Sequence, residues 1–279
     1  MTENASSRSV PPMRRTAEYL QGSFTWQKEL EYGINMPNDV FNTAVNKSIS
    51  AYSQPFILTV GYVYRTPGVT ANRLLRHAVR DWTLGGYLQY SSGLPIESPC
   101  WQNNLQTLLF QANNSAISSG TNSSACSAGT FMNRVPVQPL FLKSLNDSSF
   151  DPNKDFALNP AAWSNPVAGT FGTAAAYYND YRFQRHPVEQ MSIGRIFRIK
   201  ESVTVEVRGE FFNAFNRRNM ADPISTNSTA APQRNPQGIP IAGFGYVNSQ
   251  SLGNGSTLNN NTGLGGNPRQ GQLLVRFRF

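Results

Sequence analysis

Apolar and polar side chains alternate along six segments of this chain, each about ten residues long. In the segment SVTVEVRGEFF, valines and a phenylalanine occupy alternating positions, with threonine, glutamate and arginine between them. A period of two residues is typical of a β-strand whose two faces meet different environments. The six segments lie near residues 18–28, 55–65, 81–91, 189–199, 202–213 and 270–279. The sequence therefore predicts an all-β chain with about six long strands.

The length of these segments favours a membrane-spanning sheet. Strands of globular proteins usually have about 5–6 residues, whereas about 9–11 residues are needed to cross a bilayer at a tilt. Aromatic side chains lie near the ends of the apolar rows, as in the interfacial girdles of outer-membrane barrels; they are Trp26, Phe56, Tyr64, Trp82, Tyr90, Phe211 and Phe279. We therefore expect an antiparallel transmembrane β-barrel segment whose apolar rows face lipid. Arg195 interrupts the apolar row of the segment 189–199.

The polar rows of the last two segments carry five charged residues, which are Glu206, Arg208, Glu210, Arg276 and Arg278. A packed protein core could hold so many charges only at a high cost in free energy. A water-filled lumen could hold them readily. We therefore expect these five side chains to face the lumen of a barrel.

Long and short connections alternate along the chain. Residues 31–54, 92–187 and 216–269 form long connections, and the links between the other strands are shorter. Barrels of the outer membrane have large loops at the outer rim and short turns at the inner rim. The sequence therefore predicts three long outer loops. The last of them is polar and rich in glycine, which predicts a mobile segment.

Composition and motifs give no sign of catalysis or of nucleic-acid binding. Only 14% of the residues are charged, and no basic run is interleaved with aromatic residues despite a net charge of +8. His77 and His186 belong to no spaced set of metal ligands. Glu206 and Glu210 would lie about 13 Å apart along one strand, beyond the roughly 5–10 Å of paired glycosidase carboxylates. We expect no enzyme, no metal site and no cofactor.

Two features of the second long connection leave alternatives open. Cys100 and Cys126 are the only cysteines, and in an oxidising compartment they could form a disulfide or remain two free thiols. Aromatic residues in or near this connection could contact a ligand, or could pack the loop against itself, which is the interpretation we favour; they are Trp101, Trp163, Tyr177, Tyr178 and Tyr181.

Several strings in the chain together resemble the C-terminal part of Oar-like TonB-dependent receptors, an outer-membrane transporter family. They are GSFTWQKELEYG, DVFNTAVNKSISAYSQPFILTVGYVYRTPG, WTLGGYLQYSSGLPI, ALNPAAWSNPVAGTFGT, VEVRGEFFNAFNRRNMADP and PRQGQLLVRFRF. The resemblance covers nearly all of residues 1–279 in the family's order. It implies a barrel of about 22 strands with an N-terminal plug through which TonB acts. This chain shows no plug and no signal peptide, so we expect that Met1 is not the start of the complete protein.

The resemblance extends to the closing strand. Phe277 and Phe279 resemble the C-terminal signal that the outer-membrane barrel assembly machinery recognises. The last strand of a barrel is an unpaired edge until the barrel closes, so its backbone can pair with a strand of the machinery.

We therefore expect a barrel fragment in the outer membrane of a Gram-negative-type bacterium. Its partners would be membrane lipid, the assembly machinery and a nutrient ligand, with TonB acting only through a plug domain that this chain lacks. The alternative is a stand-alone surface or adhesion protein that binds partners through its long loops. A secreted soluble β enzyme is a third reading, which the long alternating strands disfavour.

Overall fold

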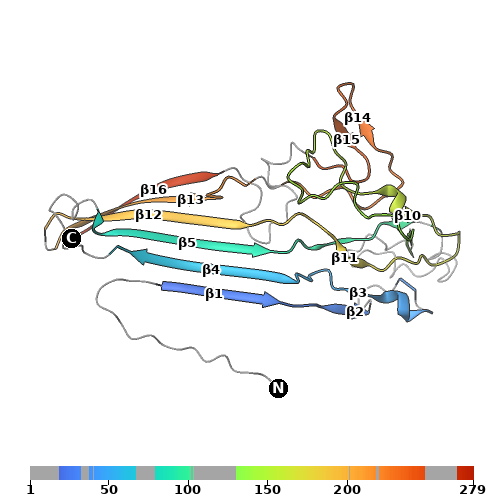
Figure 1. Cartoon of the computed structure of the whole chain (residues 1–279), viewed down its shortest axis with the longest axis horizontal. Coiled ribbons are helices and arrows are strands. Elements are labelled where there is room, and N and C mark those ends of the chain that lie inside the picture. Colours follow the sequence, from blue (N-terminus) through green and yellow to red (C-terminus); the bar gives the residue numbers. More distant parts are fainter. Residues whose placement is uncertain are drawn as a thin grey trace, which may run out of the picture.

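The computed structural model describes residues 19–32, 38–39, 41–66, 79–101, 103, 130–200, 202–217, 220–248 and 269–279. These residues form two parts, a long sheet of six strands and a compact region of loops and short strands at one end of it (Figure 1). We call the second part the cap. It consists of the described residues of 30–53, 94–103, 130–187 and 220–248.

The sheet is an antiparallel meander in which each strand pairs with the next long strand along the chain. Its strands are β1 (Tyr19–Trp26), β4 (Phe56–Arg65), β5 (Trp82–Ser91), β12 (Val188–Arg198), β13 (Thr204–Phe212) and β16 (Gln270–Arg278). These bounds differ by at most two residues from the six segments of alternating hydrophobicity. The prediction of an all-β, antiparallel chain is confirmed.

The register brings the alternating apolar positions of all six strands onto one face. Leu58 of β4 pairs with Tyr90 of β5, and Phe197 of β12 pairs with Val205 of β13. We call this continuous set of positions the apolar row and the opposite set the polar row. The apolar row is open to its surroundings, because Leu273 on β16 is 74% exposed.

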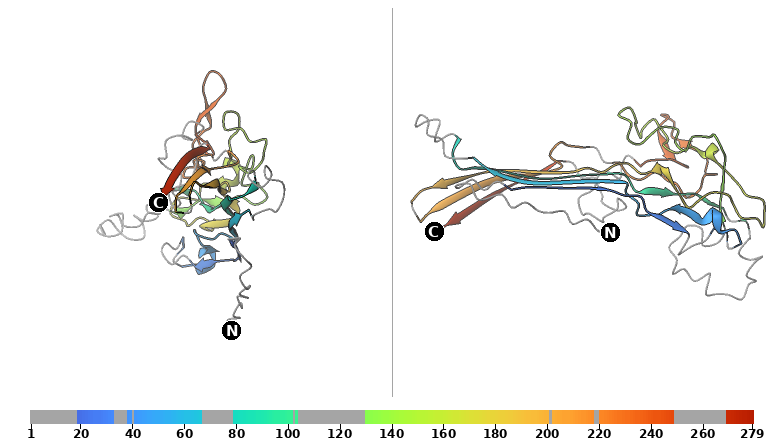
Figure 2. Two further views of the ribbon diagram at one scale, coloured as in Figure 1. Left: turned by 90° about the vertical axis from the view of Figure 1, so that its left-hand side faces the viewer. Right: turned by 60° about the horizontal axis from the view of Figure 1, so that its bottom comes forward.

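No second protein layer covers either face of the described sheet. Figure 2 shows the sheet nearly edge-on as a single layer that carries the cap at one end. The buried hydrophobic cluster of the described residues contains no residue from the six long strands. A soluble β-sandwich would bury one face of each sheet against the other, so this sheet is not half of a sandwich.

The cap is built from short elements. The two short helical turns are η1 (Thr43–Asn46) and η2 (Pro160–Ala162). Its strand pairs are β2 (Leu30–Tyr32) with β3 (Lys47–Ile49), β6 (Pro95–Glu97) with β11 (Tyr177–Arg182), β7 (Cys100–Trp101) with β8 (Thr130–Phe131), β9 (Asn133–Arg134) with β10 (Trp163–Ser164), and β14 (Gln233–Arg234) with β15 (Pro240–Ala242).

The hydrophobic core of the molecule lies in the cap. Leu158 from the second long connection and Phe244 from the third are both fully buried in one cluster. The backbone nitrogen of Ala157 donates to the carbonyl oxygen of Gly245 at 2.8 Å. Residues 220–248 are therefore packed into the cap, which differs from the mobility that their composition predicts. The rest of that connection, 249–268, lies outside the described residues.

Two polar side chains join the first long connection to the rest of the cap. The Asn38 amide nitrogen donates to the carbonyl oxygen of Gly172 at 2.7 Å, and its oxygen accepts from the backbone nitrogen of Phe131 at 3.0 Å. The guanidinium of Arg182 donates to the carbonyl oxygens of Ser53 and Gly93. The described parts of all three long connections thus meet at the same end of the sheet (Figure 1).

Candidate functional site

The five charged residues that the sequence assigns to a lumen all lie on the polar row of β13 and β16. Glu206 pairs in register with Arg276, and Glu210 pairs with Gln272. Arg208 forms salt bridges with both glutamates of its own strand, and Arg278 lies 3.7 Å from Glu206. The charges therefore form one ladder in which each carboxylate has a cationic neighbour.

Most charged side chains of the polar row lie toward the end of the sheet that is remote from the cap. Arg65 is the last residue of β4, and Arg198 is the last residue of β12. The guanidinium of Arg198 lies 3.2 Å from the carboxylate of Asp81, which precedes β5. We call this end of the sheet the inner end and the end that carries the cap the outer end.

Arg195 interrupts the apolar row, as the sequence indicates, and the structure gives the reason that it is tolerated. It lies three residues from the inner end of β12. Its guanidinium carbon lies 5.4 Å from the centre of the Trp82 ring and 5.1 Å from that of Phe197. Aromatic faces attract a guanidinium, and an arginine near a membrane interface costs only about 0–1 kcal/mol.

Glu189 is a residue whose role the sequence reasoning missed. It lies on the apolar row near the outer end of β12, and its side chain is 0% exposed. Its carboxylate accepts from the hydroxyl of Tyr90 at 2.9 Å and from the guanidinium of Arg217 at 3.1 Å. A buried carboxylate needs such partners. An acidic residue within an otherwise apolar row was the signal that could have revealed this site.

The cap aromatics act mainly as packing residues. Trp163 and Tyr181 are almost fully buried, with ring centres 5.7 Å apart. They offer no surface to a ligand, so these two residues have the packing role that we favour from the sequence over ligand contact. Tyr178 packs 6.2 Å from Trp163, and Trp101 is partly buried against the same cluster.

Tyr177 is the first residue of β11 and is partly exposed. Burial, followed by the charge of Glu97, raises its pKa to about 12. Burial also raises the pKa of Tyr181. Both phenols therefore stay neutral at physiological pH and cannot act as anionic ligands.

The remaining predicted sites are distributed along the chain. Cys100 begins β7 and is disulfide-bonded, whereas Cys126 and His77 lie outside the described residues. Burial lowers the pKa of His186. Phe277 pairs with Val205 on the apolar row and is 67% exposed, and Phe279 is fully exposed beyond the end of β16. In the described part of the sheet, β16 is an edge strand that pairs only with β13.

Among the residues that the structure describes, no group of three or more histidine, cysteine, aspartate or glutamate side chains could hold a metal ion. No helix within the same residues has the length and hydrophobicity needed to span a membrane.

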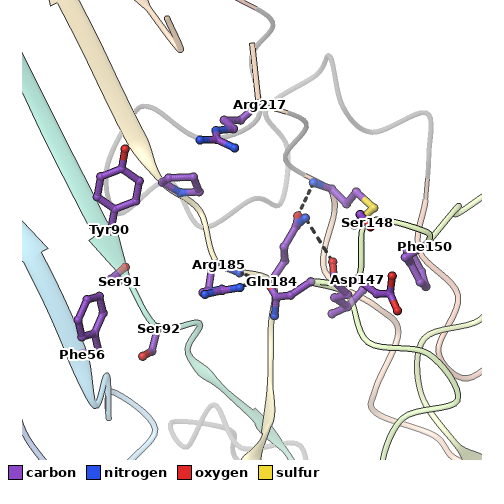
Figure 3. A pocket seen from close by; sticks show the side chains of 14 residues that line it. Phe56, Tyr90, Ser91, Ser92, Asp147, Ser148, Phe150, Gln184, Arg185 and Arg217 are labelled. Atoms are coloured by element: carbon purple, nitrogen blue, oxygen red, sulfur yellow. Dashed lines mark hydrogen bonds between the residues drawn. The ribbon is translucent and has the colours of Figure 1, made fainter. Parts of the chain in front are cut away.

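A cavity of about 710 Å³ lies where the outer ends of β4 and β5 meet the cap (Figure 3). Phe56 and Tyr90 form its sheet side, and Asp147, Phe150 and Arg185 belong to its cap side. Its volume falls within the roughly 300–1,000 Å³ of small-molecule sites. The cavity is therefore a candidate small-molecule binding site.

Comparison with known proteins adds one finding. Residues 14–272 match the family model described as an outer membrane beta barrel domain. No curated protein matches the chain, and no solved structure matches it.

Proposed function

Because the chain belongs to the outer membrane beta barrel domain family, we propose that it serves as part of the barrel of an Oar-like TonB-dependent receptor. It contributes barrel wall and ligand-facing outer loops to the uptake of a nutrient. Its location is the bacterial outer membrane. The observation that carries the proposal is the cap, in which three long outer connections fold together above one end of a membrane-spanning sheet.

The open edges of the sheet support a barrel larger than the described strands. Only one neighbour pairs with β1 and only one with β16 in the part of the chain that the structure describes. Single-chain barrels of the outer membrane usually have at least eight strands, and an unpaired backbone group in lipid costs several kcal/mol. Further strands would therefore pair with both edges and complete the barrel.

In this proposal the polar row lines the lumen. The charged ladder of Glu206, Arg208, Glu210 and Arg276 faces water and a plug domain. TonB acts through that plug and makes no contact with the strands described above. The role is transport, and no residue is assigned to catalysis.

Assembly follows from the same geometry. The exposed edge of β16 can pair with a strand of the barrel assembly machinery, and Phe277 would anchor that strand at the membrane interface. Substitution of Phe279 by serine would then lower the amount of chain in the outer membrane, which immunoblotting of membrane fractions would measure.

The test compares three bacterial strains: wild type, a strain without this gene and a strain without TonB. Each is supplied with a panel of radiolabelled iron chelates, cobalamin and oligosaccharides. The proposal predicts at least one compound whose uptake is lost in both mutant strains. If no TonB-dependent uptake changes when the gene is deleted, the receptor function is wrong.

The second candidate is a stand-alone surface or adhesion protein. It is favoured by the cap's own hydrophobic core and by the hairpin of β14 and β15, which projects from the cap (Figure 1). Such a protein would have to associate with itself to pair its edge strands. Binding of intact cells to surfaces would then depend on this gene and would not change when TonB is deleted.

A further inference from the structure

The cavity between the sheet and the cap lies beside the membrane-facing surface. Phe56 and Tyr90 both belong to the apolar row, because Leu58 pairs with Tyr90 and Phe56 is two residues before Leu58 on the same strand. Both lie at the outer ends of their strands, where aromatic side chains mark the boundary between hydrocarbon and head groups. The cavity therefore lies at the level of the head groups of the outer leaflet.

The walls of the cavity are held in place by internal hydrogen bonds. The side-chain oxygen of Gln184 accepts from the backbone nitrogen of Met220 at 2.9 Å, and its nitrogen donates to the carbonyl oxygen of Leu145 at 3.4 Å (Figure 3). On the other side, the guanidinium of Arg217 is held by the buried carboxylate of Glu189. These contacts keep the cavity formed without a ligand.

Arg185 is placed differently from Arg217, the other cation in the cavity lining. Arg185 is exposed, and its backbone nitrogen and Nε donate to the side-chain oxygen of Asn146 at 3.1 Å and 3.4 Å. Among the described residues, its two terminal nitrogens form no hydrogen bond. The hydroxyl of Ser148 lines the same cavity from an exposed position. Guanidinium, amide and hydroxyl groups can together bind sugar hydroxyls and anionic oxygens.

The apolar part of the cavity lining could bind the apolar part of a ligand whose polar part binds near Arg185. Phe56, Tyr90 and Phe150 line it together with Leu145 and Met220. An amphiphile in the outer leaflet could place its head group against Arg185 and the beginning of its acyl chain along the apolar row. A free sugar would leave this apolar surface unfilled, and a phospholipid without a sugar would make fewer hydrogen bonds to the polar side of the cavity.

We propose that this cavity binds the anionic sugar head group of an outer-leaflet glycolipid. The lining carries the cations Arg185 and Arg217 and the carboxylate of Asp147. Hydrogen bonds from Ser149 lower the pKa of Asp147, so this carboxylate is charged at neutral pH. Arg217 is neutralised by Glu189, so Arg185 is the group that binds the anionic substituent. The bound glycolipid would lie between the cap and the membrane surface and contact both.

The test uses the complete barrel protein that contains this chain, in detergent micelles, and purified fluorescent lipopolysaccharide as the probe. Arg185→Gln should weaken binding about tenfold, as expected for loss of a charged hydrogen bond. Lys154→Gln is the matched control, because it removes the same charge from an exposed position on the cap; its affinity should equal that of the wild type. Equal weakening in both variants would show unspecific attraction to a basic protein and would overturn the proposal.

Two further arms identify the source of the ligand. The delipidated polysaccharide should bind more weakly than whole lipopolysaccharide, and phosphatidylglycerol should not compete with it. Competition by phosphatidylglycerol at equal concentration would overturn the assignment to a glycolipid. If Arg185→Gln does not fold, Ser148→Phe provides a second variant that fills the cavity without changing charge. It should abolish binding while heat-modifiable migration on a gel stays unchanged, and retained binding would count against the site.

Discussion

Leu273 and Leu274 are adjacent on β16 and give a matched test of the two faces of the sheet. Leu273 lies on the apolar row opposite Gly209 and is 74% exposed, whereas Leu274 lies on the polar row opposite Arg208. Both lie near the middle of the strand. Replacement of each leucine by arginine therefore changes the same side chain at the same depth and differs only in the face.

The expected free energies of unfolding differ for the two variants. Leu273→Arg places a charge in hydrocarbon near the bilayer midplane, which costs about 2–4 kcal/mol. Leu274→Arg places it in water beside Arg208, and a like charge directly opposite costs at most about 1 kcal/mol. The difference of about 1–4 kcal/mol corresponds to a change of roughly 5- to 700-fold in the ratio of folded to unfolded protein.

The measurement is a urea titration of isolated outer membranes, with the folded fraction read from heat-modifiable migration on a gel. Leu273→Arg should unfold at a clearly lower urea concentration than the wild type, and Leu274→Arg should stay close to it. Equal midpoints for the two variants, or a lower midpoint for Leu274→Arg, would refute the assignment of the apolar row to lipid.

Five other variants probe the cap and its junction with the sheet. Burial raises the pKa of Asp222 from 3.8 to about 6, so the folded state holds this proton more tightly. The contribution of Asp222 to stability should be complete below about pH 4 and should be lost, by up to about 3 kcal/mol, as pH rises from about 4 through 6; in urea titrations at several pH values, Asp222→Asn should remove this part of the pH dependence. Arg217→Ala leaves a fully buried carboxylate without its cation and should cost about 3 kcal/mol, the lower end for a buried pair because Arg217 is half exposed. Lys154→Ala removes an exposed ion pair and should cost less than about 1 kcal/mol in the same titration. Gly245→Ala combines a φ of +77° with a new Cβ only 2.5 Å from the backbone of another cap segment. It should destabilise the cap more than Gly238→Ala, where φ is +79° and no atom lies within 4 Å, and limited proteolysis that finds the reverse order would contradict the packing described above.

The sheet could be predicted from the sequence because two environments act on every long strand. Lipid on one side and water on the other require alternation, and the alternation itself marks where a strand begins and ends. The same two-residue alternation places Glu206, Arg208 and Arg276 on one face, because the polar rows of neighbouring strands lie in register. The position of Glu189 could have been noticed as an acid on an apolar row.

The cap could not be predicted in the same way. Its core joins residues that are far apart in the chain, as in the hydrogen bond from Ala157 to Gly245, and no short period records such contacts. Polar composition in residues 216–269 suggested mobility, yet Phe244 and Val247 are fully buried. Aromatic residues such as Tyr181 have the same chemistry in a ligand site and in a core, so only the fold separates the two roles.

The placement of the hydrophobic core in the cap alone has a consequence for how the two parts tolerate mutation. In the sheet, a membrane-facing side chain meets fluid acyl chains that adapt to its shape, so leucine, valine, isoleucine and phenylalanine should replace one another freely at positions such as Leu84 and Val275. In the cap, Leu158 and Phe244 meet fixed neighbours, and loss of a single methylene there leaves a void. Natural variation in the barrel wall should therefore preserve polarity alone, whereas variation in the cap should preserve volume as well.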